Sequence, residues 1–176
     1  MKKAILSLSG GLDSTALLLH LIDKGYDSIH TITIETEGSE FVQTVADNIS
    51  LSPKLSNSTP RPGTWMPFAN REVTEADKKK HEKWRCNYDA MKQLIDNHPD
   101  YQLKPVISNE KDLYEVKYIQ NFLGGIPNDK VWLMPEGLTD EQLSTRRVWL
   151  MELCTKQGYN YTERLHIIAY GDTRGV

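Results

Sequence analysis

The sequence contains little cysteine. Cys86 and Cys154 are the only two among its 176 residues, and they lie far apart, without cysteine or histidine at ligand spacing. A structural zinc site takes four such ligands, and an iron–sulfur cluster needs at least three cysteines. We therefore expect no zinc site and no iron–sulfur cluster from this chain alone, assign no metal ligand among the cysteines and histidines, and interpret both thiols as ordinary half-buried side chains.

Long hydrophobic runs and an excess of one charge are also missing. No apolar run approaches the roughly 18 residues of a membrane span, and Lys2-Lys3 leads directly into a strand rather than into a signal peptide. With 21 Lys and Arg against 24 Asp and Glu, the net charge of -3 disfavours nucleic-acid binding by bulk charge. A local basic groove is compatible with this net charge. The sequence predicts a cytoplasmic protein that contacts neither a membrane nor nucleic acid directly.

What the sequence does contain is a regular alternation of apolar runs and helical patterns. The runs that predict strands are residues 3–8, 29–35, 49–52, 101–107, 131–134 and 164–170. The patterns that predict helices are residues 13–24, 40–48, 74–98, 109–123 and 143–156, the last with Thr139 and Gln142 as a capping box. Repeated strand–helix units give parallel strands, so we predict an α/β fold, a single domain with a mostly parallel sheet of about six strands and flanking helices.

Polar side chains follow several of the predicted strands. Glu35 and Thr36 end the second strand, Ser52 and Lys54 follow the third, and Arg174 lies in the segment after the sixth. Parallel sheets bind their ligands at the carboxyl ends of the strands, so these side chains predict one small-molecule site at this edge. There Glu35 could take a ribose hydroxyl or a magnesium ion, and Arg174 could grip a carboxylate in bidentate fashion.

The turn between the first strand and the first helix reads Ser9-Gly10-Gly11-Leu12-Asp13-Ser14. Two glycines let the backbone approach a ligand closely, and the N–H groups at the start of the helix face the turn. This arrangement is typical of an anion-binding loop. The alternative is a plain strand–turn–helix joint in which the glycines serve only the turn.

This loop resembles the pyrophosphate-binding loop of the PP-loop ATP pyrophosphatases, and residues 1–27 look most like the first unit of the 7-cyano-7-deazaguanine synthases in that family. The resemblance implies ATP, activation of a carboxylate with magnesium, and phosphate contacts from Ser9, Gly10, Gly11, Asp13, Ser14 and Thr15. The late four-cysteine zinc site of those synthases is missing here.

Residues 29–176 resemble the carboxy-terminal part of the 7-carboxy-7-deazaguanine synthases, which are radical S-adenosylmethionine enzymes. The matching stretches are Ile34 to Ser39, Leu51 to Ser58, Tyr101 to Lys104, Leu133 to Gly137, Arg164 to Ile168 and Gly171 to Val176. The resemblance implies part of a radical-enzyme barrel, or a Rossmann-like sheet, with S-adenosylmethionine contacted by Ser52 and Lys54. It also implies magnesium and a pterin or deazaguanine substrate held by Arg174. The three-cysteine motif of this family is absent.

Three functions stay open from the sequence. The first is a role in 7-deazaguanine and queuosine precursor synthesis, as a relative of a lyase in a tRNA-modification pathway. The second is an ATP-dependent enzyme built on the opening loop. The third is a catalytically inactive nucleotide-binding module. No catalytic residue can be assigned from the sequence. His166, inside the last predicted strand, is interpreted as a core histidine. An uncovered edge strand would favour a homodimer.

Overall fold

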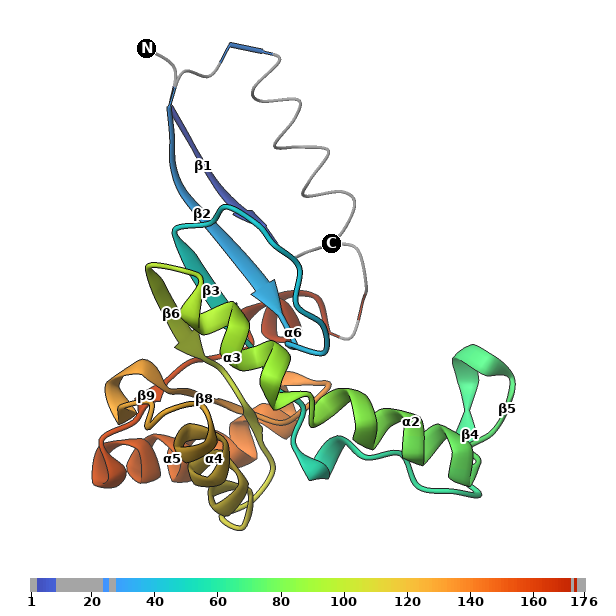
Figure 1. The fold of residues 1–176 in the computed structure, drawn as a ribbon. Coiled ribbons are helices and arrows are strands. Elements are labelled where there is room, and N and C mark those ends of the chain that lie inside the picture. The colour runs from blue at the N-terminus through green and yellow to red at the C-terminus, as the bar shows by residue number, and fades with distance from the viewer. Residues whose placement is uncertain (1–2, 9–23, 26–27, 172, 174–176) are drawn as a thin grey trace.

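The computed structural model describes residues 3–8, 24–25, 28–171 and 173 of the chain (Figure 1). The first predicted helix therefore lies almost entirely outside the described residues. So do seven of the predicted site residues, namely Ser9, Gly10, Gly11, Asp13, Ser14, Thr15 and Arg174.

The described strands form an open parallel sheet that follows the order of the chain. One part contains β1 (Lys3–Leu8), β2 (Ser28–Thr36), β3 (Asn48–Leu51) and β6 (Asp100–Leu103). The other contains β7 (Val106–Ile107), β8 (Trp132–Pro135) and β9 (Asn160–Tyr161). A parallel bridge from Leu103 to Val131 joins the two parts. All these pairings are parallel, which confirms the predicted α/β class.

A proline separates β6 from β7, which the sequence predicts as one strand. Pro105 has no N–H to donate to a neighbouring strand, so the ladder is interrupted at this residue. The residues on either side stay in the sheet, because Lys104 N donates to Leu51 O at 2.7 Å and Met134 N donates to Pro105 O at 3.1 Å. With β6 and β7 counted as one interrupted strand, the described sheet has six parallel strands, which is the number that the sequence predicts.

The helices between the later strands cover one face of the sheet. They are α3 (Tyr88–Asp96), α4 (Asp112–Phe122) and α5 (Asp140–Gln157). Sequential parallel strands with right-handed crossovers place their helices on the same face. One hydrophobic cluster joins these helices to the sheet, with the helical residues Met91, Val116, Ile119 and Leu150 packed with Ile49, Leu51, Leu103 and Leu133 of the strands. The strand order lacks the reversal of a Rossmann sheet, and the described strands do not close into a barrel.

Helix α5 begins and ends as its sequence predicts. Thr139 Oγ1 accepts a hydrogen bond from Gln142 N at 3.2 Å, while the Gln142 side chain accepts from Leu138 N at 2.7 Å, one residue before the cap. Gly158 ends the helix in the left-handed region with φ of 74°. None of the helices that the structure describes is long and apolar enough to cross a membrane.

Residues 59–85 form an arm that projects from the sheet (Figure 1). It consists of the two-stranded β4 (Trp65–Met66) and β5 (Arg71–Glu72), the short 3-10 turn η2 (Pro67–Ala69) between them and the helix α2 (Glu75–Arg85), in which no residue is buried. Arg71 holds Asp77 through two hydrogen bonds of 2.6 and 2.7 Å, and Thr74 caps the helix. The stretch 59–73, for which the sequence predicts neither strand nor helix, thus contains the short strands β4 and β5.

A cluster of charges at the base of the arm ties it to the rest of the protein. Arg85 donates to both carboxylate oxygens of Glu82 and pairs with Glu115 of α4, and Thr59 also donates to Glu82. The hydrogen bonds from Arg85 are the main cause that lowers the pKa of Glu82 from 4.5 to about 2. The lowered pKa means that folding favours the ionised carboxylate.

The pH dependence of stability should report this cluster. A folded-state pKa below the unfolded value stabilises the protein above pH 4.5, and this stabilisation is lost as the pH falls toward about 2. We expect Glu82→Gln to lower the free energy of unfolding by on the order of 1 kcal/mol at pH 7, since the pair is partly exposed to water. In urea titrations from pH 7 to 2 the difference between wild type and variant should shrink, and the decrease should fall below pH 4.5. A difference that is constant with pH would contradict this assignment.

Two of the predicted helices are wrong, one in its existence and one in its extent. Residues 40–48 form no helix, because Phe41 and Ala46, which pack inward, are five positions apart and cannot share one helical face. The predicted helix at 74–98 is two helices. Asn87 ends the first by capping the second, since its side chain accepts from Ala90 N and donates to Ser39 O at 2.8 Å.

The predicted last strand at 164–170 is also wrong. The sixth strand is β9, two residues after Gly158, and residues Leu165–Tyr170 form the short helix α6. In α6 only Ile167 is buried, whereas Leu165 is 71% exposed. The periodicity of a short apolar run does not distinguish a strand from a helix. In the structure Asn160 and Tyr161, rather than residues 164–170, pair with β8.

Candidate functional site

The sheet has two chemically different faces, and the alternation of side chains along each strand produces them. Ile49, Leu51, Leu103 and Leu133 point toward the helices and are fully buried. Their immediate neighbours point to the opposite face and are mostly polar. Ser50 is buried there and accepts a hydrogen bond from Gln102 Nε2 at 2.9 Å. The face away from the helices is thus a polar surface.

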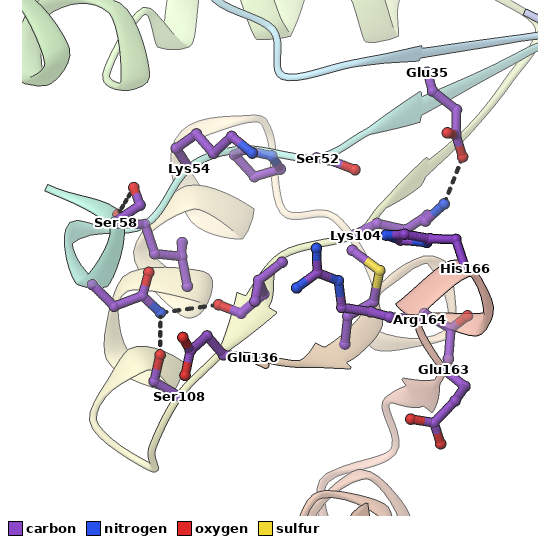
Figure 2. A pocket seen from close by; sticks show the side chains of 16 residues that line it. Glu35, Ser52, Lys54, Ser58, Lys104, Ser108, Glu136, Glu163, Arg164 and His166 are labelled. Atoms are coloured by element: carbon purple, nitrogen blue, oxygen red, sulfur yellow. Dashed lines mark hydrogen bonds and ion pairs between the residues drawn. The ribbon is translucent and has the colours of Figure 1, made fainter. Parts of the chain in front are cut away.

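A cavity of about 480 Å³ opens on this polar face, near the carboxyl ends of the strands (Figure 2). Its size lies within the usual range of small-molecule sites, about 300–1,000 Å³. Residues from β2 to α6 line it, so it crosses most of the sheet. They include Glu35, Ser52, Lys54, Asn57, Lys104, Ser108, Met134, Glu136, Arg164 and His166.

Glu35, at the end of β2, lies at one end of the cavity. Its carboxylate accepts a hydrogen bond from Lys104 Nζ at 2.7 Å, so the pair is neutral overall while one carboxylate oxygen stays open to the cavity. Thr36 is placed differently. It does not line the cavity, and its hydroxyl accepts a hydrogen bond from Gly38 N at 3.1 Å.

Ser52 and Lys54 follow β3 and line the same part of the cavity. The backbone N–H of Ser52 donates to Thr36 O at 2.7 Å, which fixes the segment against β2 and leaves the hydroxyl free. Pro53 is buried between them. The Lys54 side chain is exposed and makes no ion pair with any residue that the structure describes. The cavity therefore has an uncompensated ammonium group on this wall.

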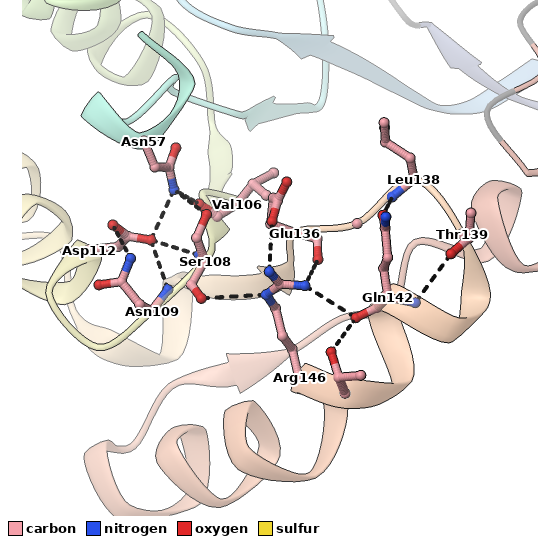
Figure 3. A network of polar contacts seen from close by, with 12 residues as sticks. Asn57, Val106, Ser108, Asn109, Asp112, Glu136, Leu138, Thr139, Gln142 and Arg146 are labelled. Carbon is pink, nitrogen blue, oxygen red and sulfur yellow. Dashed lines mark hydrogen bonds and ion pairs between the residues drawn. The ribbon is translucent and has the colours of Figure 1, made fainter.

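A polar network holds the wall opposite Glu35 in place (Figure 3). Its centre is Asp112, a buried carboxylate whose Oδ2 accepts from Ser108 N at 2.6 Å, from Asn109 N at 3.1 Å and from Asn57 Nδ2 at 2.9 Å. Asn57 Nδ2 also donates to Val106 O and to the Ser108 hydroxyl. These contacts fix the loop after β7 to η1 (Ser56–Ser58), the 3-10 turn that follows Lys54.

The acidic side chains at the far end of the cavity are already neutralised. Arg146 pairs with Glu136 at 3.1 Å and also donates to the Glu136 backbone carbonyl. Arg147 pairs with Glu163 at 2.7 Å, and Tyr161 donates to the same Glu163 oxygen at 2.6 Å. Burial, then the hydrogen bond to Glu163, raises the pKa of the Tyr161 phenol well above its usual value, so Tyr161 stays protonated.

Arg164 extends into the centre of the cavity, where Figure 2 shows its guanidinium between Lys104 and Glu136. Its Nη1 donates to the Gly137 carbonyl at 2.8 Å, and it pairs with no carboxylate in the described part of the chain. His166 lies beside it. The interpretation of His166 as a core histidine is wrong, because His166 is exposed and lines the cavity.

The described walls of the cavity carry three ion pairs and two cationic side chains that have no acidic partner. Lys104 is paired with Glu35, Glu136 with Arg146, and Glu163 with Arg147. Among the described lining residues this leaves Lys54 and Arg164 without an acidic partner. Such a cavity favours a ligand with negative groups.

The structure brings together three of the four predicted site residues that it describes, namely Glu35, Ser52 and Lys54. Sequence reasoning missed Lys104, Ser108 and Arg164. The first two carry a signal, because Lys104 and Ser108 are the polar positions that alternate with buried Leu103 and Ile107. Arg164 was missed because the sequence predicts it as the first residue of a strand at 164–170, whereas it precedes the helix α6.

Comparison with known proteins gives homologues of one name. The chain is 34% identical over 159 residues to the 7-carboxy-7-deazaguanine synthase of Rhodopirellula baltica, covering 90% of this chain and 58% of the relative. It is 33% identical over 172 residues to the 7-carboxy-7-deazaguanine synthase of Halobacterium salinarum, covering 91% and 60%. A third, from Pyrobaculum aerophilum, is 36% identical over 80 residues, covering 44% and 34%. No family model matches the chain.

Two limits of these alignments matter for the interpretation. The chain spans about three fifths of the length of the first two curated relatives. Residues 29–176 make up less than 90% of the chain, so both longer alignments extend into the opening unit that resembles a PP-loop protein. The homology to 7-carboxy-7-deazaguanine synthases thus begins before residue 29.

Proposed function

We propose that this chain, as a homologue of the 7-carboxy-7-deazaguanine synthases, serves 7-deazaguanine and queuosine precursor synthesis and binds S-adenosylmethionine in the cavity on the polar face. The observation that carries the proposal is the convergence of Glu35, Ser52 and Lys54. These residues come from two strands, and they line one part of one cavity. The substrate we propose beside the cofactor is a small pterin.

The chemistry of this part of the cavity fits the polar groups of S-adenosylmethionine. The free Lys54 ammonium would attract the carboxylate of the methionine portion, and the Ser52 hydroxyl would donate or accept one hydrogen bond. The open oxygen of Glu35 would accept from ribose hydroxyls. Lys104 keeps the Glu35 carboxylate in place for this contact. Each of these groups binds or orients the ligand, and none is assigned a step in bond cleavage.

An iron–sulfur cluster does not fit the residues of this chain. Three thiolates are required, and the chain has only Cys86 and Cys154. Cys154 is buried, which raises the pKa of its thiol to about 11 and keeps it protonated at neutral pH. Within the described residues, no group of three His, Cys, Asp or Glu side chains could hold a metal ion. We therefore propose binding of S-adenosylmethionine and derive no radical chemistry for the chain by itself.

Isothermal titration of the chain with S-adenosylmethionine tests the proposal. We expect saturable binding that weakens about 10-fold or more in Lys54→Ala and several-fold in Ser52→Ala, since each removes a polar contact worth roughly 1–2 kcal/mol. Lys92→Ala is the matched control, because Lys92 pairs with Asp96 on the exposed side of α3 and is remote from the cavity lining. The control should bind as the wild type does.

A second titration with magnesium-ATP separates this function from the ATP-dependent alternative. If S-adenosylmethionine does not bind but magnesium-ATP does, and Asp13→Asn abolishes that binding, the proposed function is wrong and the opening loop is the working site. If neither ligand binds, both proposals fail and the inactive module is favoured.

A further inference from the structure

We infer that the groove between the helices α4 and α5 is a second binding site, which takes a small molecule that combines an aromatic ring with a chain of phosphates, such as a nucleoside diphosphate. A cavity of about 460 Å³ opens there, within the usual range of about 300–1,000 Å³ for small-molecule sites. It shares no lining residue with the cavity on the polar face of the sheet. The groove is therefore independent of the proposed function.

Three lysine side chains line this groove. Lys111 immediately precedes α4, Lys117 lies within α4, and Lys156 belongs to the last turn of α5. All three are exposed, and none forms an ion pair with a residue that the structure describes. Glu110 is the only acidic side chain among the described lining residues, so the groove carries an excess of positive charge. Such an excess attracts a ligand with several negative charges.

The stability of the two helices accounts for only one of these lysines. Lys156 lies near the carboxyl end of α5, where the helix dipole favours a cation. Lys111 lies at the amino end of α4, where the dipole favours an anion instead, and the acidic side chain one turn along, Glu115, pairs with Arg85. Lys117 has no acidic residue three or four positions away in either direction. Binding of an external anion would explain the positions of Lys111 and Lys117.

The other walls of the groove suit an aromatic ring. Tyr114 lies between Lys111 and Lys117 in a row of residues spaced three apart along α4, and it is 79% exposed. Leu113, which is buried, and Leu153, which packs against the core, give the groove an apolar base. A ring can pack against these leucines and stack on the phenol, as bases do on exposed aromatic side chains.

The spacing of the lysines fits a chain of phosphates better than a single phosphate. Lys117 follows Lys111 by six positions, which is about 9 Å along the axis of α4. A lysine ammonium is a compact charge on a flexible four-carbon stem, so both groups can reach neighbouring phosphates of one ligand. Lys156 approaches from the other helix, and packed helices lie about 8–10 Å apart. A diphosphate between the helices is thus within reach of all three lysines.

Isothermal titration with uridine diphosphate, pyrophosphate and uridine tests the site. These probes carry the ring and the phosphates together and separately, and uracil resembles neither the adenine of S-adenosylmethionine nor a pterin. We expect uridine diphosphate to bind saturably and pyrophosphate to bind about 10-fold more weakly, since pyrophosphate lacks the stacking ring. Uridine should show no saturable binding, because it lacks the groups that the lysines attract.

Variants of the groove assign the binding to its side chains. Lys117→Ala should weaken uridine diphosphate and pyrophosphate alike, by about 5- to 20-fold, and the triple variant Lys111→Ala, Lys117→Ala, Lys156→Ala should bind neither. Tyr114→Ala should weaken uridine diphosphate by about 5-fold and change pyrophosphate less than twofold. These side chains are exposed, so an unchanged thermal unfolding midpoint is expected. Lys79→Ala, on the exposed face of α2, is the matched control and should bind as the wild type does.

Several results would overturn the site. They are an absence of saturable binding of both phosphate probes to the wild type, and equal affinities in the wild type and the triple variant. Loss of pyrophosphate binding in Asp13→Asn with binding retained in the triple variant would also overturn it, because the opening loop would then hold the phosphates. If the chain binds uridine diphosphate through these lysines but does not bind S-adenosylmethionine, the proposed function is wrong and the groove site stands.

Discussion

Replacing Gly38 with alanine is expected to lower the free energy of unfolding by roughly 2–5 kcal/mol, as measured by urea or thermal unfolding. Gly38 follows β2 and has a φ of 76°, in the left-handed region where a Cβ is unfavourable. A Cβ there would also lie 2.6 Å from Leu51 Cδ1 and 2.6 Å from Met91 Cγ. Both side chains are fully buried in the core, so a shift of either one would disturb its packing there.

Gly158→Ala separates the two causes of this loss. Gly158 has nearly the same φ, 74°, but a Cβ built on it meets no atom within 4 Å. The conformational cost alone should lower the free energy of unfolding by roughly 1–2 kcal/mol. If Gly38→Ala and Gly158→Ala destabilise equally, the close packing of Gly38 against Leu51 and Met91 contributes nothing and the assignment is wrong.

Replacing Asp112 with alanine is expected to cost roughly 3–5 kcal/mol of stability and to weaken ligand binding in the cavity. The change removes the Asp112 acceptor from the backbone N–H groups of Ser108 and Asn109, while the side-chain amide of Asn57 keeps Val106 O and the Ser108 hydroxyl. A donor left without a partner away from water costs about 1–3 kcal/mol. The loop after β7 and η1 would then lose their common anchor.

Asp112→Asn is the conservative comparison, since its amide oxygen can still accept from the same donors. We expect it to lose less than half as much stability as Asp112→Ala in the same unfolding measurement. Asp96→Ala, which removes an exposed carboxylate paired with Lys92, should cost less than about 0.5 kcal/mol. A loss for Asp112→Ala no larger than that of Asp96→Ala would contradict the central role of the buried carboxylate.

The parts of the fold that the sequence predicts well are those in which local pattern and tertiary packing agree. Helix α5 begins after the Thr139 cap and ends at Gly158. Strands β2 and β3 begin and end within one residue of the predicted runs. The failures are segments whose conformation depends on a distant partner. Asn87 breaks the long predicted helix because it also reaches Ser39, forty-eight positions away.

The candidate site shows the same division. Glu35, Ser52 and Lys54 could be predicted because they follow strands directly, and strand ends in a parallel sheet meet at one edge. Arg164 could not be placed from its sequence, since its position depends on where β9 pairs with β8 and on the turn into α6. The neutralisation of Glu136 and Glu163 by Arg146 and Arg147 is likewise visible only in three dimensions.

The chain-order arrangement of the sheet has a consequence for how the protein is made. Within the described parallel sheet the strands lie side by side in chain order, β1, β2, β3 and β6 in one part and β7, β8 and β9 in the other, with the Leu103–Val131 bridge joining the two parts. The chain leaves the ribosome amino terminus first, at about 5–20 residues per second. Each strand that leaves the ribosome therefore finds its pairing edge already present, and no strand has to be inserted between two others. The cavity becomes complete last, when the segment that carries Arg164 and His166 emerges.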